Sequence, residues 1–353
     1  MSRRADLATE PIRSLGVWGP GPLGDLVMAT PAMRSLATMF PGARRTLYAT
    51  RAGQELITGD PSFDEVVVRE RAVRPMAATM RRRRHDLVVV LANSFRSALV
   101  ARLSGARWRV GYAAGGRSLL LTHAVPRRSG RHSQDPAPMV TSYLDLLRGA
   151  GLEVPDTAPV VLHTTAGERE TANELLVAAG MDPDDLIVAV SPGAAYGSAK
   201  RWPAERFGEV VRRLLHEQSP PVRVVVLAAP DERPIVEELL AGVGPERDRV
   251  VSDHLPLDLA RAVLSRAALH ITNDTGSRHI GHAVGSPTIA ILGPTHTAWS
   301  SYPGQDVDVL QVDLDCGPCM KRVCPLGTRR CMFDIGVERV MELARRRLSE
   351  LAT

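Results

Sequence analysis

Residues 271–279 read Ile-Thr-Asn-Asp-Thr-Gly-Ser-Arg-His, and this stretch decides how the rest of the chain is understood. The apolar run that leads into it, residues 267–272, predicts a buried strand, and a short helical spacing of apolar residues follows. A turn between a strand and the start of a helix offers unpaired amide groups and the positive end of the helix dipole, which suit a phosphate group. Gly276 lets a ligand approach the backbone closely. Capping of the helix by Asp274 or Thr275 is the simpler alternative for the same turn.

The composition indicates a globular protein with two domains. A chain of 353 residues is long for one core, and 44% hydrophobic with 24% charged residues is ordinary for a soluble protein. No apolar run approaches the length of a membrane-spanning helix, and no apolar segment follows Met1 as a secretory signal would require. We therefore expect a cytoplasmic protein.

The net charge of +5 is unevenly distributed along the chain. Residues 1–162 contain 23 Arg against 13 Asp and Glu, a net charge of +10, whereas the remainder carries −5. We therefore expect the first half to meet an anionic partner such as a phosphorylated glycan, a membrane surface or a nucleic acid. A solvated basic face is the alternative. Lysine is almost absent, because only Lys200 and Lys321 occur.

The four cysteines all fall within one short window, with the spacing C-x2-C-x4-C-x6-C. A Cys-x-x-Cys pair with two further thiols could hold a tetrahedral zinc ion, which would be structural because four thiolates leave no open position. Reduced thiols or a redox-sensitive disulfide are the alternatives in a cytoplasm. The residues concerned are Cys316, Cys319, Cys324 and Cys331.

Apolar runs alternate with helical spacings along both halves of the chain. Strands that are apolar throughout and separated by helices favour parallel sheets covered on both faces, and ligands of such sheets bind beyond the carboxyl ends of the strands. The expected strands are 14–19, 46–50, 65–68, 86–91, 107–112, 186–190, 222–227, 267–272 and 287–292. The expected helices include 25–40, 139–149, 168–179, 203–217, 234–240, 257–266 and 337–351.

Three of the expected strand ends carry residues that could bind a phosphate or transfer a proton. Lys200 combines a compact ammonium group with a nearby helix start, which suits a diphosphate oxygen, although a surface lysine is the alternative. Asp25 could act as a general base on an attacking hydroxyl group or could simply cap a helix. His279 could donate a hydrogen bond to a phosphate or could be a core histidine.

These motifs occur together in an order that resembles a known family. The segments 24–34, 192–203, 273–279 and 293–295 resemble the ADP-heptose–lipopolysaccharide heptosyltransferases of glycosyltransferase family 9. The cysteine segment is similar to that of heptosyltransferase II-like members. One departure is Ser277-Arg278, where the family often has Pro-Met.

The resemblance implies an α/β chain with the GT-B fold, in which two Rossmann-like domains with parallel sheets face a central cleft. Residues 1–162 would bind the acceptor, residues 163–336 would bind the nucleotide sugar, and the helix at 337–353 would pack back on the N-terminal domain. The implied reaction is an inverting transfer of heptose from an ADP-heptose to a hydroxyl group of a glycan such as lipopolysaccharide inner core. It needs no catalytic metal or other cofactor.

The resemblance also assigns roles to individual residues. Asp25 takes the place of the proposed base. The acceptor is expected to meet the basic first half, including Arg81, Arg82, Arg83 and Arg84. The donor-binding residues are Lys200 and the turn Thr275-Gly276 for the diphosphate, His279 beside them, Asp274 near the sugar, Ala195 in the preceding loop, and Asp231 or Glu232 for the ribose.

Other functions remain open at this point. The donor could be another nucleotide sugar, the acceptor a secondary metabolite, or the protein a sensor that binds the donor without turnover. A basic nucleic-acid-binding protein with a four-cysteine zinc module is a further alternative. Nucleic acid is not the expected partner, because aromatic residues make up only 4% and no reader motif is present. The expected partners are an ADP-sugar, an anionic glycan or glycolipid, and peripheral contact with an anionic inner-membrane surface.

Overall fold

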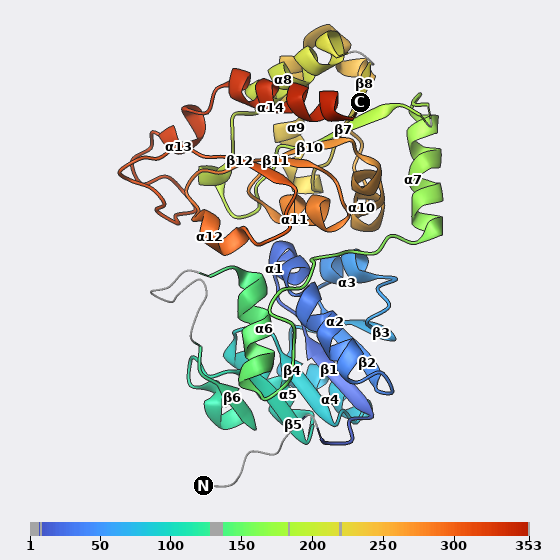
Figure 1. Ribbon diagram of the computed structural model, residues 1–353, viewed down its shortest axis with the longest axis vertical. Helices are drawn as coiled ribbons and strands as arrows, with labels where there is room; N and C mark the ends of the chain where they lie inside the picture. Colours follow the sequence, from blue (N-terminus) through green and yellow to red (C-terminus); the bar gives the residue numbers. More distant parts are fainter. Residues whose placement is uncertain (1–6, 8, 128–136, 183, 219–220, 352–353) are drawn as a thin grey trace. The chain divides into compact units, whose positions relative to one another are not determined.

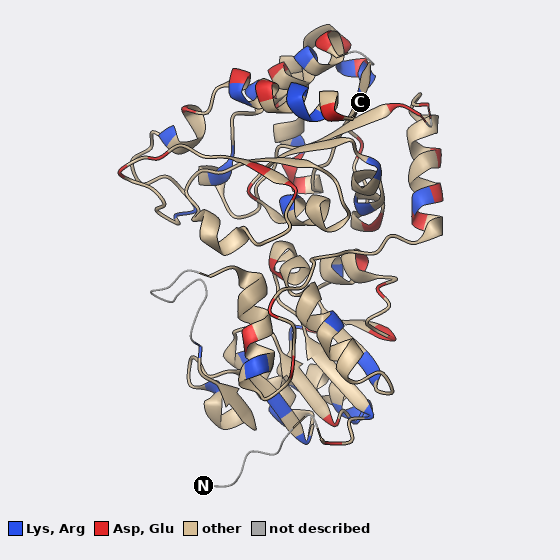
Figure 2. Ribbon diagram, viewed as in Figure 1, with Lys and Arg blue, Asp and Glu red and all other residues tan. Residues whose placement is uncertain are grey.

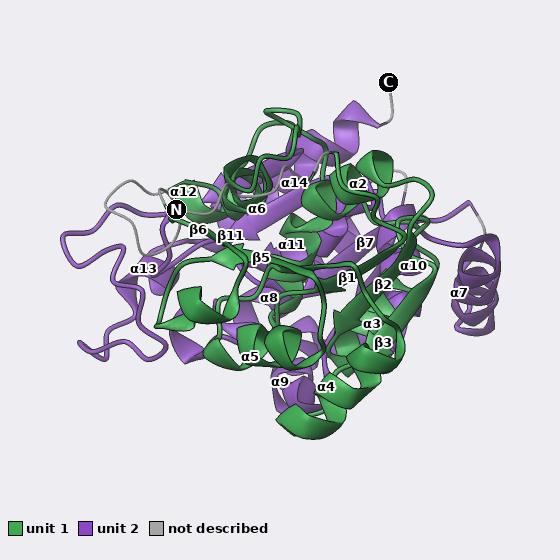
Figure 3. Ribbon diagram, turned by 90° about the horizontal axis from the view of Figure 1, so that it is seen from below, with its two compact units in different colours: residues 1–163, 298–304 green, residues 164–297, 305–353 purple. Residues whose placement is uncertain are grey.

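A computed structural model describes the chain except for residues 1–6, 8, 128–136, 183, 219–220 and 352–353. The chain forms two compact units (Figure 3). Unit 1 comprises Met1–His163 with Ala298–Gly304, and unit 2 comprises Thr164–Thr297 with Gln305–Thr353. The division after His163 lies next to the expected boundary at 162, but the return of residues 298–304 to unit 1 was not foreseen.

Unit 1 is a six-stranded parallel sheet with the strand order β3-β2-β1-β4-β5-β6 (Figure 1). Its central strands are apolar and fully buried, which is why helices cover both faces of the sheet. The elements are β1 Ser14–Trp18, α1 Leu23–Met28, α2 Thr30–Met39, β2 Arg44–Ala49, α3 Arg51–Ile57, β3 Glu65–Val68, α4 Val73–Arg82, β4 Leu87–Val90, α5 Phe95–Leu103, β5 Trp108–Tyr112, η1 Arg117–Leu120, β6 His123–Val125 and α6 Met139–Gly149.

Unit 2 repeats the same arrangement, with the order β12-β11-β10-β7-β8-β9 and parallel pairing throughout. Its elements are α7 Ala166–Ala178, β7 Leu186–Ser191, η2 Ser198–Lys200, α8 Ala204–Glu217, β8 Val222–Val226, η3 Pro230–Glu232, α9 Arg233–Val243, η4 Gly244–Arg249, β9 Val250–Val251, α10 Leu257–Arg266, β10 Leu269–Asn273, α11 Gly276–Ala283, β11 Thr288–Ile291, β12 Val307–Leu310, α13 Arg330–Phe333 and α14 Val337–Glu350. A short helix, α12 Thr297–Ser300, joins the two units.

The strand order places a topological switch point in each unit. The chain reverses its direction of sheet growth between β1 and β4 in unit 1 and between β7 and β10 in unit 2. Ligands of such sheets bind beyond the carboxyl ends of the strands at this point. Both units therefore offer a binding edge, and the expected strands on either side of it are confirmed.

The C-terminal helix does not pack where the resemblance implied. The apolar face of α14 belongs to the core of unit 2, where it packs on α8, so the expectation that it packs back on the N-terminal domain is wrong. Two ion-paired arginines, Arg213 and Arg345, bridge the exposed sides of the two helices through Glu217 and Glu338. The buried residues of α14 are Val340, Met341, Ala344 and Leu348.

The helix expected over residues 25–40 is divided into α1 and α2 at Ala29. Pro31 lies in the first turn of α2, where its missing N–H is tolerated. The division leaves Asp25 in the first turn of a separate short helix.

Arginines gather at the edge of unit 1 where the strands begin, and Figure 2 shows blue segments along it. Arg13 and Arg44 lie at the starts of β1 and β2, and the run 81–84 precedes β4. Glu65 on the same edge pairs with Arg83 and Arg44, so part of this charge is compensated. Within the part of the chain that the structure describes, no helix is long and apolar enough to cross a bilayer.

Candidate active site

Three sequence motifs meet at the switch point of unit 2. The buried side chain of Asn273, the last residue of β10, joins them. Its Nδ2 donates to the carbonyl of Pro192 at 2.7 Å, and its Oδ1 accepts from the backbone N–H of Trp202 at 3.1 Å. The loop after β7, the Lys200 segment and the turn after β10 are thus brought together as expected.

The carboxylate of Asp274 forms the centre of this site. Its Oδ2 accepts from Lys200 Nζ and from Thr295 Oγ1, both at 2.6 Å, and its Oδ1 lies 3.2 Å from Arg278 Nη1. Lys200 Nζ also donates to the carbonyl of Asp274 at 3.0 Å. Arg278 and Thr295 were not among the site residues predicted from the sequence. Arg278 could have been predicted as a site residue from its i, i+4 spacing to Asp274.

Two cations around one carboxylate give the site a net positive charge. Burial would raise the pKa of Asp274, but the ion pairs with Lys200 and Arg278 outweigh it and hold that pKa below its ordinary value. The side chain of Arg278 is 0% exposed and that of Lys200 is 11% exposed. The ammonium also lies 4.9 Å from the centre of the Tyr196 ring, a cation–π contact. The arrangement can therefore bind an anion without first ionising a group.

Two histidines near Asp274, Lys200 and Arg278 are buried and neutral. Burial and the charge of Arg278 lower the pKa of His279 to about 3, and burial lowers that of His270 to about 3. His270 Nε2 lies 3.0 Å from Ser191 Oγ and 3.2 Å from Ser277 Oγ. Ser277 thus ties the first turn of α11 to β7 and β10. His279 lies in the core, and a neutral imidazole can still donate one hydrogen bond.

The turn at Thr275 and Gly276 leads directly into α11. Thr275 is the N-cap, and its side chain makes no capping hydrogen bond. Asp274 is engaged by cations instead, so the capping alternative for this turn is wrong. The first amide groups of α11 lie next to the Lys200–Asp274 pair.

The ribose candidates lie beyond β8, on η3. The carboxylate of Glu232 sits directly against Gly193, where any side chain would collide with it, and accepts from the N–H of Ala229 at 3.1 Å. Asp231 is exposed on the same turn. Ala195 is exposed on the turn after β7. The structure thus brings Glu232, but not Asp231, against the loop at the switch point.

Asp25 lies at the corresponding edge of unit 1. It occupies the first turn of α1, whose N-cap is Pro22, so Asp25 is not the N-cap. The preceding turn is fixed by Arg69, which donates to the carbonyls of Gly19 at 2.8 Å and Pro20 at 3.3 Å. The Arg69 guanidinium also lies 5.3 Å from the centre of the Trp18 ring. A rigid turn of this kind can hold a carboxylate for proton transfer.

The four arginines at 81–84 do not lie near Asp25. Arg81, Arg82, Arg83 and Arg84 precede β4, whereas Asp25 follows β1, its parallel neighbour. The two therefore lie at opposite edges of the sheet, separated by a strand length of roughly 15 Å. Arg81 and Arg83 are engaged with the carbonyl of Leu103 and with Glu65.

The four thiols belong to the segment that follows β12, and the zinc ion expected there stays a prediction. Cys316 is exposed, and Cys331 lies at the start of α13 against Gly293. Cys324 Sγ accepts from the N–H of Arg329 at 3.4 Å, and such hydrogen bonds lower the pKa of its thiol. Across the described residues, no three His, Cys, Asp or Glu side chains converge as a metal site.

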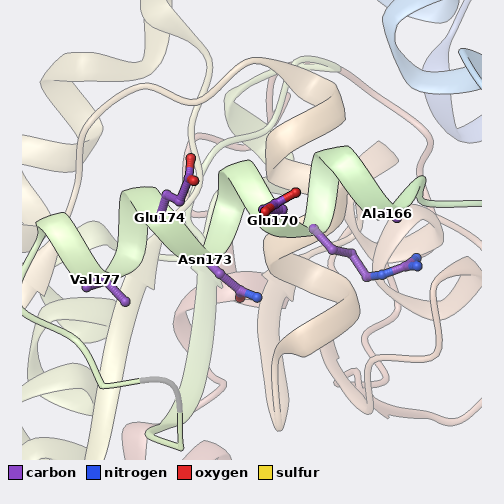
Figure 4. Close-up of a pocket in the computed structure, with 6 residues that line it drawn as sticks. Ala166, Glu170, Asn173, Glu174 and Val177 are labelled. Carbon is purple, nitrogen blue, oxygen red and sulfur yellow. The ribbon is translucent and has the colours of Figure 1, made fainter.

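A hollow of about 510 Å³ lies on α7 (Figure 4). Its lining comes from one stripe of that helix, from Ala166 to Val177, with Arg169 and Glu170 among the polar groups. None of the expected site residues contributes to it. A single open helix face has no converging groups for chemistry, so this hollow is not the active site.

Comparison with known proteins agrees with the geometry of unit 2. Residues 73–329 match the model of glycosyltransferase family 9 (heptosyltransferase). The chain belongs to glycosyltransferase family 9. It is therefore a glycosyltransferase, as expected from its motifs.

Relatives of this family 9 glycosyltransferase cover nearly all of its length. It is 26% identical to lipopolysaccharide heptosyltransferase 2 of Escherichia coli K12, over 92% of this chain and 96% of that protein. It is 25% identical to lipooligosaccharide heptosyltransferase 2 of Campylobacter jejuni serotype O:6, over 91% and 94%. The expected likeness to heptosyltransferase II-like members is confirmed.

Solved structures confirm the fold. The structure of E. coli ADP-heptose lipopolysaccharide heptosyltransferase II matches with a TM-score of 0.81 at 23% identity, covering 96% of this chain and 100% of that one. A family 9 glycosyltransferase from Veillonella parvula matches with a TM-score of 0.80 at 21% identity, covering 99% and 100%. This family 9 glycosyltransferase thus has the GT-B type of α/β fold with two Rossmann-like domains, and the nucleic-acid alternative is not favoured.

Proposed function

We propose that this family 9 glycosyltransferase transfers heptose from an ADP-heptose to a hydroxyl group of lipopolysaccharide inner core. The observation that carries the proposal is the cationic cluster of Lys200 and Arg278 around Asp274, at the switch point of unit 2. Its position after β10 suits a diphosphate beside the first turn of α11. The names of the relatives supply the sugar and the acceptor.

The proposed reaction is a single displacement with inversion. An acceptor oxygen attacks the anomeric carbon, the bond from that carbon to the diphosphate oxygen breaks, and ADP leaves with the electron pair. Asp25 accepts the proton of the acceptor hydroxyl. Lys200 and the first amides of α11 stabilise the charge that develops on ADP, so no metal ion is required for this step.

The remaining donor contacts are proposed from their positions. Glu232 accepts hydrogen bonds from the ribose hydroxyl groups, and Asp274 faces the sugar end of the diphosphate. His279, neutral at physiological pH, supports the diphosphate from within α11. Unit 1 binds the acceptor through the carboxyl edge of its sheet, and the protein works at the cytoplasmic surface of the inner membrane, where its basic edge contacts anionic lipid.

The test is transfer by the purified protein from ADP-heptose to inner core lacking the final heptose, followed by mass spectrometry of the product. We expect the acceptor mass to rise by one heptose residue and ADP to be released in equal amount. UDP- and GDP-sugars serve as the control donors. Turnover with one of these, and none with ADP-heptose, would contradict the proposed donor.

A further inference from the structure

A second hollow, lined mostly by polar groups, lies in unit 2 at the carboxyl ends of β11 and β12. Its volume is about 420 Å³, within the range of roughly 300–1,000 Å³ that is usual for small-molecule sites. The loop after β11 contributes His296, and the loop after β12 contributes Gln311, Asp313 and Asp315. The cysteine segment closes one side through Cys331.

The strand order shows on which side of the cationic cluster this hollow lies. Along the sheet, β8 and its Glu232 lie on one side of the β7–β10 switch point, whereas β11 and β12 lie on the other. In the proposed function, the ribose meets Glu232 and the diphosphate lies at Lys200. An extended nucleotide sugar then directs its sugar end toward β11 and β12.

A chain of hydrogen bonds connects the hollow to the cluster. Gln311 Nε2 donates to the carbonyls of Gly293 at 3.2 Å and Thr295 at 2.9 Å, which fixes the loop after β11. Thr295 in turn donates from Oγ1 to Asp274 Oδ2 at 2.6 Å. The wall of the hollow and the carboxylate nearest the transferred sugar are therefore parts of one bonded network.

The chemistry of the lining suits hydroxyl groups rather than another anion. Asp313 and Asp315 are exposed, and no ion pair joins either of them to another described residue. The lining includes no Lys or Arg, although the chain contains 42 Arg. Carboxylates accept hydrogen bonds from adjacent hydroxyl groups and repel a phosphate.

We propose that this hollow binds the hydroxyl-bearing side chain of the transferred sugar, with Asp313 and Asp315 as the hydrogen-bond acceptors. The inference rests on the proposed function and extends it from the nucleotide to the sugar. It also gives the cysteine segment a role, because that segment forms one wall of the hollow. Selection of a seven-carbon sugar over a hexose would then take place here.

The test compares the binding of ADP with that of a non-transferable ADP-heptose, by calorimetry, in the parent and in a D313A/D315A variant. We expect the Kd of ADP to stay within about twofold. The Kd of the ADP-heptose analogue should rise at least about tenfold, as expected for the loss of hydrogen bonds to charged groups. Asp248→Asn, an exposed carboxylate before β9 on the same unit, should change neither value.

Equal weakening of ADP and of the analogue, or unchanged binding of the analogue, would overturn the sugar site. A parent protein that binds the analogue no better than ADP would overturn it as well. Transfer of heptose by the parent, measured separately, reports on the proposed function. The two ideas can therefore fail independently.

Discussion

At the scale of single residues, Asp274 holds two cations and a hydroxyl group on one buried carboxylate. The sequence indicated Lys200 and Asp274 through their motifs, because a strand end followed by a helix start is visible locally. It could not indicate Thr295, which follows the next strand, whereas the i, i+4 spacing from Asp274 offered a signal for Arg278. The contact of Thr295 with Asp274 depends on the pairing of β10 with β11.

The proposed base gives the first prediction. Asp25→Asn should keep the fold and the ADP-induced rise in thermal midpoint, because Asp25 is half-buried on unit 1 and the nucleotide is held by unit 2. Its rate of ADP release with acceptor should fall about 10²- to 10⁴-fold. A rate close to that of the parent would exclude Asp25 as the base.

The second prediction concerns the coupling between Arg278 and Asp274. Arg278→Met should lower the free energy of unfolding by about 3 kcal/mol, because it removes one partner of a buried ion pair. In an Asp274→Asn background, the same change should cost less, with a coupling energy of at least about 1 kcal/mol. Urea unfolding of the four proteins measures this cycle, and additive losses would show that the pair is not coupled.

At the scale of elements, long apolar segments were predictable and short ones were not. The helix at 257–266 and the start of the one at 337 are found as expected, because each has a full apolar stripe. The strands β6, β9 and β12 were not predicted, and β6 has only three residues. β9 has only two residues, and the four residues of β12 are mostly half-buried at the sheet edge, so neither gives a periodic signal.

The third prediction tests the position of α14. Met341→Ala should destabilise the protein by about 2–5 kcal/mol, because Met341 is fully buried in the core of unit 2. The matched control is Glu342→Ala, at the next, exposed position of the same helix, which should stay within about 0.5 kcal/mol. Similar urea midpoints for both variants would contradict the packing of this helix.

At the scale of the whole molecule, the two parallel sheets share one strand order, and the family resemblance implied two Rossmann-like domains with parallel sheets. The division into two units could be predicted because the strand–helix alternation occurs twice. The return of residues 298–304 to unit 1 could not, since no local pattern marks a chain crossing.

Buried histidines in both units give the fourth prediction. His85 in unit 1 has its pKa lowered by burial to about 4, and His270 and His279 in unit 2 to about 3, from an ordinary value of 6.5. Below about pH 6.5, the unfolded chain binds protons that the folded chain does not. The free energy of unfolding should therefore fall with decreasing pH, by up to about 1.4 kcal/mol per pH unit for each histidine.

Urea unfolding at about pH 7.5 and about pH 5 checks this dependence. His270→Gln should reduce the difference between the two pH values, whereas His254→Gln, at an exposed position before α10, should leave it nearly unchanged. A stability that does not change between these pH values would contradict the neutral state of the buried imidazoles.

The scarcity of lysine has a practical consequence for chemical footprinting. Lys321 is exposed, whereas Lys200 is 11% exposed and ion-paired, so the two side-chain amines should differ strongly in their reaction with an acylating reagent. Peptide mapping should show rapid acylation of Lys321 and slow acylation of Lys200, with ADP slowing only the latter. A single peptide would then report occupancy of the nucleotide site, with the peptide that contains Lys321 as its internal standard.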